Sequence, residues 1–139
     1  LNIGLLFVIH DSRDALTFSD EILIIQNGKL LKKESAKNLT QNPPSKYAAQ
    51  LLGLINIFRG EELNKSFDLD CIKNKDYWLP QSALIIETGK QFKVIHELFL
   101  GDEFEYDLCD NKINITIRSK ERLASKAYNI SVTDPVFIE

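Results

Sequence analysis

One histidine in the sequence is the first candidate for chemistry, because it ends an apolar run. Leu5–Ile9 is unbroken and apolar, and His10 and Asp11 follow it directly. Strands buried on both faces have this composition and belong mainly to parallel α/β sheets. Such sheets bind ligands outside the carboxyl ends of their strands, so His10 would lie at the edge of the sheet where ligands bind. The alternative is that His10 only ends a strand and points into solvent.

The second histidine, His96, lies in an alternating pattern instead. It is in phase with Phe92, Val94 and Leu98. This phase predicts that His96 faces the interior of a small barrel as a hydrogen-bonded structural residue, and a ligand role is the alternative.

Several charged residues are candidates for ion binding. Glu103, Glu105 and Asp107 alternate on one predicted strand, which indicates a solvated face or, alternatively, a site for a hard cation. An oxyanion would need a nest of backbone N–H groups or a basic pocket. The basic residues that could contribute are not arranged in any motif: Lys90, Lys93, Arg118, Lys120 and Arg122.

The remaining chemical residue types have simpler interpretations. Cys71 and Cys109 lack metal-type spacing, and a catalytic thiol would need a histidine partner. Tyr77 and Trp78 are interpreted as core or interface residues. No nucleophile–base or metal-ligand set predicts an enzyme complete within this chain.

The first part of the chain has the elements of an α/β piece. Asp11 can cap a helix whose buried side would hold Ala15, Leu16 and Phe18. Ile22–Ile25 is predicted as a second buried strand, and Asn27-Gly28 as a hairpin turn.

Two short helices are expected to follow that hairpin. One begins at Ser35 and ends near Asn42, because Pro43-Pro44 cannot continue it. Ser45 caps the next, which ends at Gly53. The apolar face of this second helix is predicted to hold Tyr47, Ala48, Leu51 and Leu52.

After Gly53 the apolar period changes to two, which predicts short antiparallel strands. The fold class is therefore α+β: an α/β piece at 1–53, followed by a small antiparallel OB-like barrel at 54–139. Residues 64–75 are predicted as a loop, with a weak strand around 67–72. Strands are expected at 83–86, 92–100, 104–108, 113–117, 130–132 and 136–138.

Composition narrows the functional classes. The chain has 139 residues, 44% of them hydrophobic, and a net charge of −3. This balance gives no basic face for nucleic acid. No apolar run reaches the roughly 20 residues that a membrane span needs. The chain opens on Leu1 and lacks methionine, so we expect it to be part of a longer protein.

These patterns together resemble one known family. Val8-Ile9-His10-Asp11, Asp14-Ala15-Leu16, Ser19-Asp20-Glu21-Ile22 and Asn27-Gly28-Lys29 are similar, in order and spacing, to the end of an ABC-transporter ATPase domain. Asn42-Pro43, Lys46-Tyr47-Ala48, Leu52-Gly53 and Asn56 are similar to the step that leads into an importer's accessory domain. Trp78–Ser82 and Phe99-Leu100-Gly101 resemble parts of a TOBE-type domain, although Leu79 and Gln81 replace that family's Arg and Glu.

The resemblance implies specific roles. His10 would be the switch histidine, both catalytic and nucleotide-binding, but only in a complete ATPase domain. Residues 54–139 would be a regulatory and dimerisation domain. The parent protein would use ATP and Mg²⁺, whereas this fragment has no cofactor, and no G-x-x-x-x-G-K-[ST] occurs in it. We therefore expect the fragment to have no ATPase activity.

The resemblance also implies partners and a location. They are a second copy of the chain, a transmembrane permease subunit and, where regulation occurs, a small-molecule effector. The location implied is cytoplasmic and peripheral to the inner membrane. The alternative from a different class is a free-standing β-barrel that binds a small oxyanion.

Overall fold

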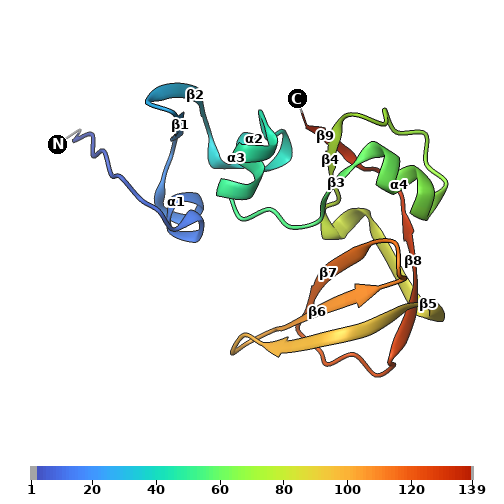
Figure 1. Ribbon diagram of the computed structural model, residues 1–139. Helices are drawn as coiled ribbons and strands as arrows, with labels where there is room; N and C mark the ends of the chain where they lie inside the picture. The colour runs from blue at the N-terminus through green and yellow to red at the C-terminus, as the bar shows by residue number, and fades with distance from the viewer. Residues whose placement is uncertain (1–2, 139) are drawn as a thin grey trace. The chain divides into compact units, whose positions relative to one another are not determined.

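The computed structural model describes residues 3–138 and divides the chain into two compact units (Figure 1). The boundary lies between Gly53 and Leu54. The first unit contains α1 (Ser12–Phe18), β1 (Ile22–Gln26), β2 (Lys29–Glu34), α2 (Ala36–Gln41) and α3 (Lys46–Leu51). The second contains β3 (Ile57–Arg59), α4 (Gly60–Phe67), β4 (Asp76–Trp78), the 3₁₀ turn η1 (Gln81–Ala83), β5 (Leu84–Phe99), β6 (Phe104–Cys109), β7 (Asn114–Ser119), β8 (Ala127–Val132) and β9 (Val136–Ile138).

The predicted α+β fold class is confirmed. Every strand pair in residues 3–138 is antiparallel. The second unit has a three-stranded sheet in the order β3-β4-β9 and a four-stranded sheet in the order β7-β6-β5-β8. The four-stranded sheet curls into an OB-like half-barrel (Figure 1).

Local signals determine the elements of the first unit. Asn27 and Gly28 both have positive φ, 51° and 72°, which is the two-residue turn that joins β1 to β2. Ser35 accepts a hydrogen bond from Asn38 N, and Ser45 accepts one from Ala48 N, so both predicted helix caps are confirmed. Gly53 follows α3, the last helix of the first unit, and has φ 74°.

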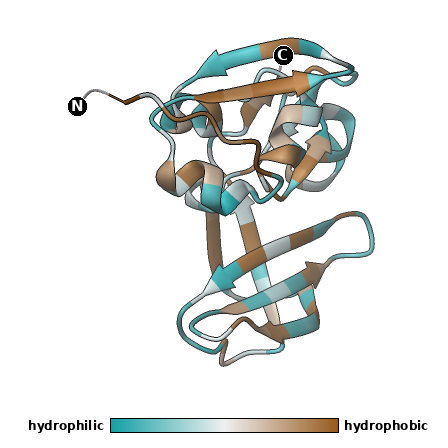
Figure 2. Cartoon of the chain, turned by 90° about the vertical axis from the view of Figure 1, so that its left-hand side faces the viewer, coloured by the Kyte–Doolittle hydropathy of each residue, from teal (hydrophilic) through white to brown (hydrophobic). Residues whose placement is uncertain are grey.

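The prediction of a buried strand at Leu5–Ile9 is wrong in this structure. The segment has no regular secondary structure, and its side chains are exposed, Val8 fully so. Figure 2 shows its apolar character. A strand of a parallel sheet needs hydrogen-bonded neighbours on both sides, and no described residue pairs with this segment.

The apolar faces of two helices also differ from expectation. Helix α1 has no buried residue, and Phe18 is 80% exposed. On the predicted apolar face of α3, Ala48 and Leu52 are buried as expected, but Tyr47 and Leu51 are exposed and Ala49 is buried instead. These helices are too short for the apolar period alone to select the buried face.

The region after Gly53 contains a helix that the sequence reading missed. Residues 60–67 form α4, and no strand exists at 67–72 because Asp68 ends the helix in the left-handed conformation with φ 54°. Leu63 is fully buried, and the Phe67 ring stacks on Phe92 of β5 at 5.9 Å. Helix α4 therefore covers part of the core.

The strands predicted at 83–86 and 92–100 are joined in one long strand. β5 runs from Leu84 to Phe99 with irregular pairing between Thr88 and Phe92. There the side chain of Asn129 accepts hydrogen bonds from Lys90 N and Gln91 N, at 3.2 and 3.3 Å. This side chain satisfies backbone groups that the bulge removes from the strand ladder.

One continuous core holds the second unit together. It joins α4, β4 and the concave face of the four-stranded sheet. Its buried members are Leu63, Cys71, Tyr77, Leu79, Leu84, Phe92, Tyr106, Leu108, Ile113, Ile115, Ile117, Tyr128 and Ile130. Among residues 3–138, no helix is long and apolar enough to cross a membrane.

Candidate functional site

His10 lies in the first unit, immediately before α1. It is exposed, and within the described residues no hydrogen bond or ion pair engages its ring. Asp11 caps α1 by accepting a hydrogen bond from Arg13 N at 2.8 Å. The start of the helix is therefore fixed, while the imidazole one residue before the cap is free to contact a ligand.

Two contacts join elements of the first unit. A β-carbon added to Gly53, which has φ 74°, would lie 3.0 Å from Ser12 Oγ, so the end of α3 passes close to the start of α1. Tyr47 donates from its hydroxyl to the carbonyl of Ile25 at 3.3 Å, which joins α3 to β1. Gly53 and Tyr47, which belong to the family resemblance, thus contact α1 and β1.

The expectation for His96 is wrong. Its side chain is 60% exposed, and Nδ1 lies 3.8 Å from Asp107 Oδ2 on the neighbouring strand. The register of β5 on β6 shifts between Val94 and His96. One extra residue in a strand moves the following side chains to the other face, so the apolar phase that includes Val94 does not extend to His96.

The acidic side chains of β6 have partners. Glu105 accepts a hydrogen bond from Arg118 Nε at 2.9 Å, and Asp107 accepts one from Thr116 Oγ1 at 2.7 Å. Glu103 also lies 3.9 Å from Arg118. Across residues 3–138 no group of three or more His, Cys, Asp or Glu side chains is placed to hold a metal ion.

The basic residues proposed for an oxyanion site are partly engaged. Arg118 is paired as described above, and Arg122 donates to both carboxylate oxygens of Glu97, at 3.0 and 3.3 Å. This hydrogen bond raises the pKa of Arg122. Two of the five candidate cations are therefore already neutralised by carboxylates.

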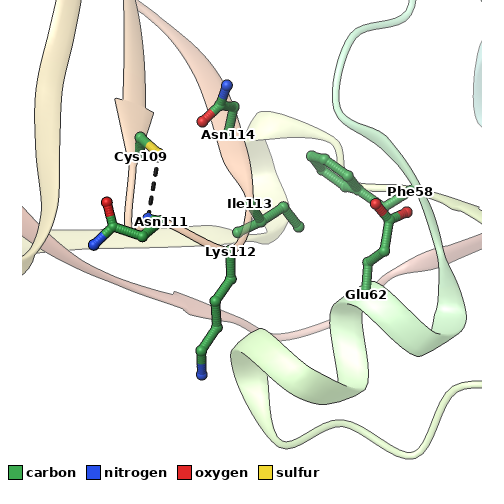
Figure 3. A pocket seen from close by; sticks show the side chains of 7 residues that line it. All are labelled: Phe58, Glu62, Cys109, Asn111, Lys112, Ile113 and Asn114. Carbon is green, nitrogen blue, oxygen red and sulfur yellow. Dashed lines mark hydrogen bonds between the residues drawn. The ribbon is translucent and has the colours of Figure 1, made fainter.

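Hollows of modest size occur on the second unit, and two of them are defined by their lining residues. One, of about 240 Å³, lies between β3, α4 and the β6–β7 hairpin, with Phe58, Glu62 and Lys112 among its lining residues (Figure 3). Its Cys109 Sγ accepts a hydrogen bond from Asn111 N at 3.3 Å. The other, of about 370 Å³, adjoins the end of α4 and β8. One acid and one lysine in the first hollow define no charge preference.

The two cysteines are free. Cys71 is buried, and burial, with a smaller contribution from Asp70, raises the pKa of its thiol above the ordinary 9.0. A thiol with a raised pKa is a poor nucleophile at neutral pH, so Cys71 is a core residue. Tyr77 is also buried in the core, as predicted.

Sequence reasoning missed the amides that hold the second unit together. Asn56 and Gln81 bind β7, and Asn129 binds the bulge of β5. Asn56 did stand out in the family pattern, but no spacing rule predicts its partner 60 residues away.

Comparison with known proteins identifies relatives but no family profile matches the chain. The spermidine/putrescine import ATP-binding protein PotA of Clostridium acetobutylicum is 27% identical over 156 aligned positions, which cover 100% of this chain and 42% of that protein. PotA of Clostridioides difficile is also 27% identical, over 80% of the chain. The Fe(3+) ions import ATP-binding protein FbpC of Mannheimia succiniciproducens is 39% identical over 44% of the chain.

These matches confirm the predicted resemblance to ATP-binding subunits of ABC importers. The chain is similar, over most or all of its length, to ATP-binding subunits of ABC importers. It spans less than half the length of these curated relatives.

Proposed function

We propose that this chain forms the last part of the ATP-binding subunit of a bacterial ABC importer. The observation that carries the proposal is the alignment with the PotA of Clostridium acetobutylicum, which includes the whole chain. One relative is named for spermidine and putrescine and another for Fe(3+). Since these solutes differ in chemistry, the proposal names an importer without a solute.

In this proposal His10 is the switch histidine. Hydrolysis of ATP requires stabilisation of charge on the γ-phosphate and a positioned water. The exposed imidazole directly before the capped start of α1 supports the role, because its donors face no competing partner in the described residues. ATP and Mg²⁺ would be held mainly by a phosphate loop and acidic residues that another part of the subunit supplies, and the chain alone would not hydrolyse ATP.

The second unit would be a TOBE-type accessory domain with a regulatory and dimerisation role. Its curled antiparallel sheet and self-contained core support a module that folds on its own beside an ATPase domain. The partners would be a second copy, a membrane permease and an effector, and the complex would lie on the cytoplasmic side of the membrane. Regulation would be a population shift, since an effector must bind one state of the dimer better than the other.

The exposed apolar segment Leu5–Ile9 supports a partner for the first unit. Four of its five side chains are at least 69% exposed, and contiguous exposed apolar surface marks an interaction site. In the subunit this segment would be covered by the remainder of the ATPase domain. In the isolated chain we expect it to bring two copies together, which light scattering over a tenfold dilution tests; a monomeric mass throughout would contradict this.

The test of the function is ATP hydrolysis by the full-length subunit. His10→Ala is expected to lower the turnover rate at least 100-fold and to weaken ATP binding much less, because a phosphate loop and acidic residues would hold most of the nucleotide. The matched control is His96→Ala, an exposed histidine of the second unit, which is expected to leave the rate within twofold. A full-length protein without ATPase activity, or an unchanged rate with His10→Ala, would refute the proposal.

A further inference from the structure

The outer edge of β7 is occupied by side chains instead of a strand. β7 pairs with β6 on one side, and in the described residues it ends the order β7-β6-β5-β8. An edge strand presents unpaired N–H and C=O groups at every second residue. In β7 those residues include Thr116 and Arg118.

Two amide side chains bind these backbone groups. Asn56 Oδ1 accepts from Thr116 N at 2.8 Å, and Asn56 Nδ2 donates to Thr116 O at 2.7 Å. Two residues further, Gln81 Oε1 accepts from Arg118 N at 2.9 Å, and Gln81 Nε2 donates to Arg118 O. Each amide thus makes both hydrogen bonds that one residue of a neighbouring strand would make.

Both amides are held in place by their own backbone. Asn56 has φ 62°, a left-handed conformation that asparagine tolerates better than most residues, and its carbonyl accepts from Leu79 N at 2.9 Å. Gln81 begins η1, whose backbone is closed by the bond from Ala83 N to Pro80 O at 2.9 Å. Only a primary amide offers a donor and an acceptor in the planar arrangement of a peptide group.

The outer edge of β7, which Asn56 and Gln81 cover, has a sequence that can pair with the same edge of a second copy. In an antiparallel pair of two β7 strands centred on Thr116, each Thr116 would face its counterpart and each Arg118 would face Asn114. No like charges would be opposed. Such a pair has two-fold symmetry and uses the same surface on both copies.

We propose that Asn56 and Gln81 form a clasp that closes the edge of β7, and that opening the clasp makes this edge a pairing surface for β7 of a second copy. The clasp also fixes the chain three residues after the boundary at Gly53, because Asn56 is bound to the middle of β7. The proposal does not depend on the function proposed above.

The test compares single and double variants of the full chain by amide hydrogen exchange. Asn56→Gly keeps the positive φ and removes the amide, and it is expected to speed exchange at Thr116 at least tenfold. Gln81→Ala is expected to do the same at Arg118. Asn56→Asp keeps an acceptor for Thr116 N, so it should retain most of the protection at Thr116. The Ile117 amide, which belongs to the pair with Tyr106 of β6, reports whether the unit remains folded.

Matched controls make the same substitutions elsewhere. Asn111→Gly replaces another asparagine of positive φ, 73°, and Gln91→Ala replaces another exposed glutamine. Neither side chain binds β7, so exchange at Thr116 and Arg118 should be unchanged. Unchanged exchange in Asn56→Gly and in Gln81→Ala would overturn the clasp.

A separate measurement tests whether the opened edge of β7 pairs with β7 of a second copy. In a mixture of differently isotope-labelled copies, the variant Asn56→Gly/Gln81→Ala is expected to show intermolecular NMR contacts at Thr116. Its protection at Thr116 should return as concentration rises tenfold. Association through Leu5–Ile9 would give neither signal. Faster exchange with no recovery at high concentration would overturn the pairing surface.

Discussion

The two compact units of the chain differ in how much of their apolar surface their own residues cover. Among residues 3–53 the large buried side chains are few, namely Ile24, Leu39 and Leu52, and Leu5 and Phe18 are 76% and 80% exposed. In the second unit a continuous core extends from α4 through β4 to β8.

The two units are therefore stabilised by different kinds of interaction. The first unit depends on local devices: the caps at Asp11, Ser35 and Ser45 and the turn at Asn27-Gly28. Caps contribute on the order of 1 kcal/mol each and do not replace a core. The second unit depends on contacts between residues far apart in sequence, so packing defects should harm it much more.

The largest expected effect is a cavity in the second unit. Phe92 is fully buried and stacks on Phe67. Phe92→Ala is expected to lower the free energy of unfolding of this unit by about 3–5 kcal/mol. The single tryptophan, Trp78, lies in β4, so its fluorescence during urea denaturation reports this unit alone.

The matched substitution in the first unit is Phe18→Ala, at a residue that is 80% exposed. We expect the free energy of unfolding of the first unit to change by no more than about 0.5 kcal/mol. The NMR signals of the Ala48 and Ala49 methyl groups during denaturation measure it. A loss above 1 kcal/mol in the first unit, or below 1 kcal/mol for Phe92→Ala, would contradict the contrast between the units.

A smaller loss of stability is expected when a glycine of the second unit, Gly60, is replaced by alanine. A β-carbon at Gly60 would overlap the carbonyl oxygen of Ile72 and lie 3.1 Å from Cys71 Cβ. Because backbone must move to relieve this overlap, Gly60→Ala should destabilise the second unit by about 1–3 kcal/mol. At Gly4, in the first unit, nothing lies within 4 Å of the added atom. Equal denaturation midpoints for Gly60→Ala and the unmodified chain would show that the approach to Ile72 is looser in solution.

The smallest expected effect is a titration in the first unit. The pKa of Glu34 is lowered from 4.5, first by the hydrogen bond from Asn38 Nδ2 at 3.1 Å and then by Ser35 N. A lowered folded-state pKa means that the stabilisation is present above 4.5 and is lost as pH falls through the folded-state value. Asn38→Ala should move the pKa of Glu34 back toward 4.5, as measured by NMR titration of the carboxyl carbon. Gln41→Ala, in the same helix, should not move it, and an unchanged pKa in Asn38→Ala would exclude this cause.

Local sequence determined the caps, the hairpin turn and most of the strands. Asp11, Ser35 and Ser45 begin helices, and β6 alternates with Tyr106 and Leu108 buried, because these signals act over two to four residues. The order of residues around His10 also indicated the similarity to ATP-binding subunits of ABC importers, and the role of His10 as a switch histidine stays a prediction.

Tertiary structure alone decided which side chains are buried and which strand edges are hydrogen-bonded. A bulge after Val94 turns His96 outward, and helix α4 forms where a polar loop was expected, because Leu63 and Phe67 reach a core built by distant strands. Leu5–Ile9 lacks strand neighbours among residues 3–138, so its apolar pattern did not make it a strand. The clasp of Asn56 on Thr116 joins residues 60 positions apart. Hydrogen bonds at this separation follow from the path of the whole chain, which local periodicity does not encode.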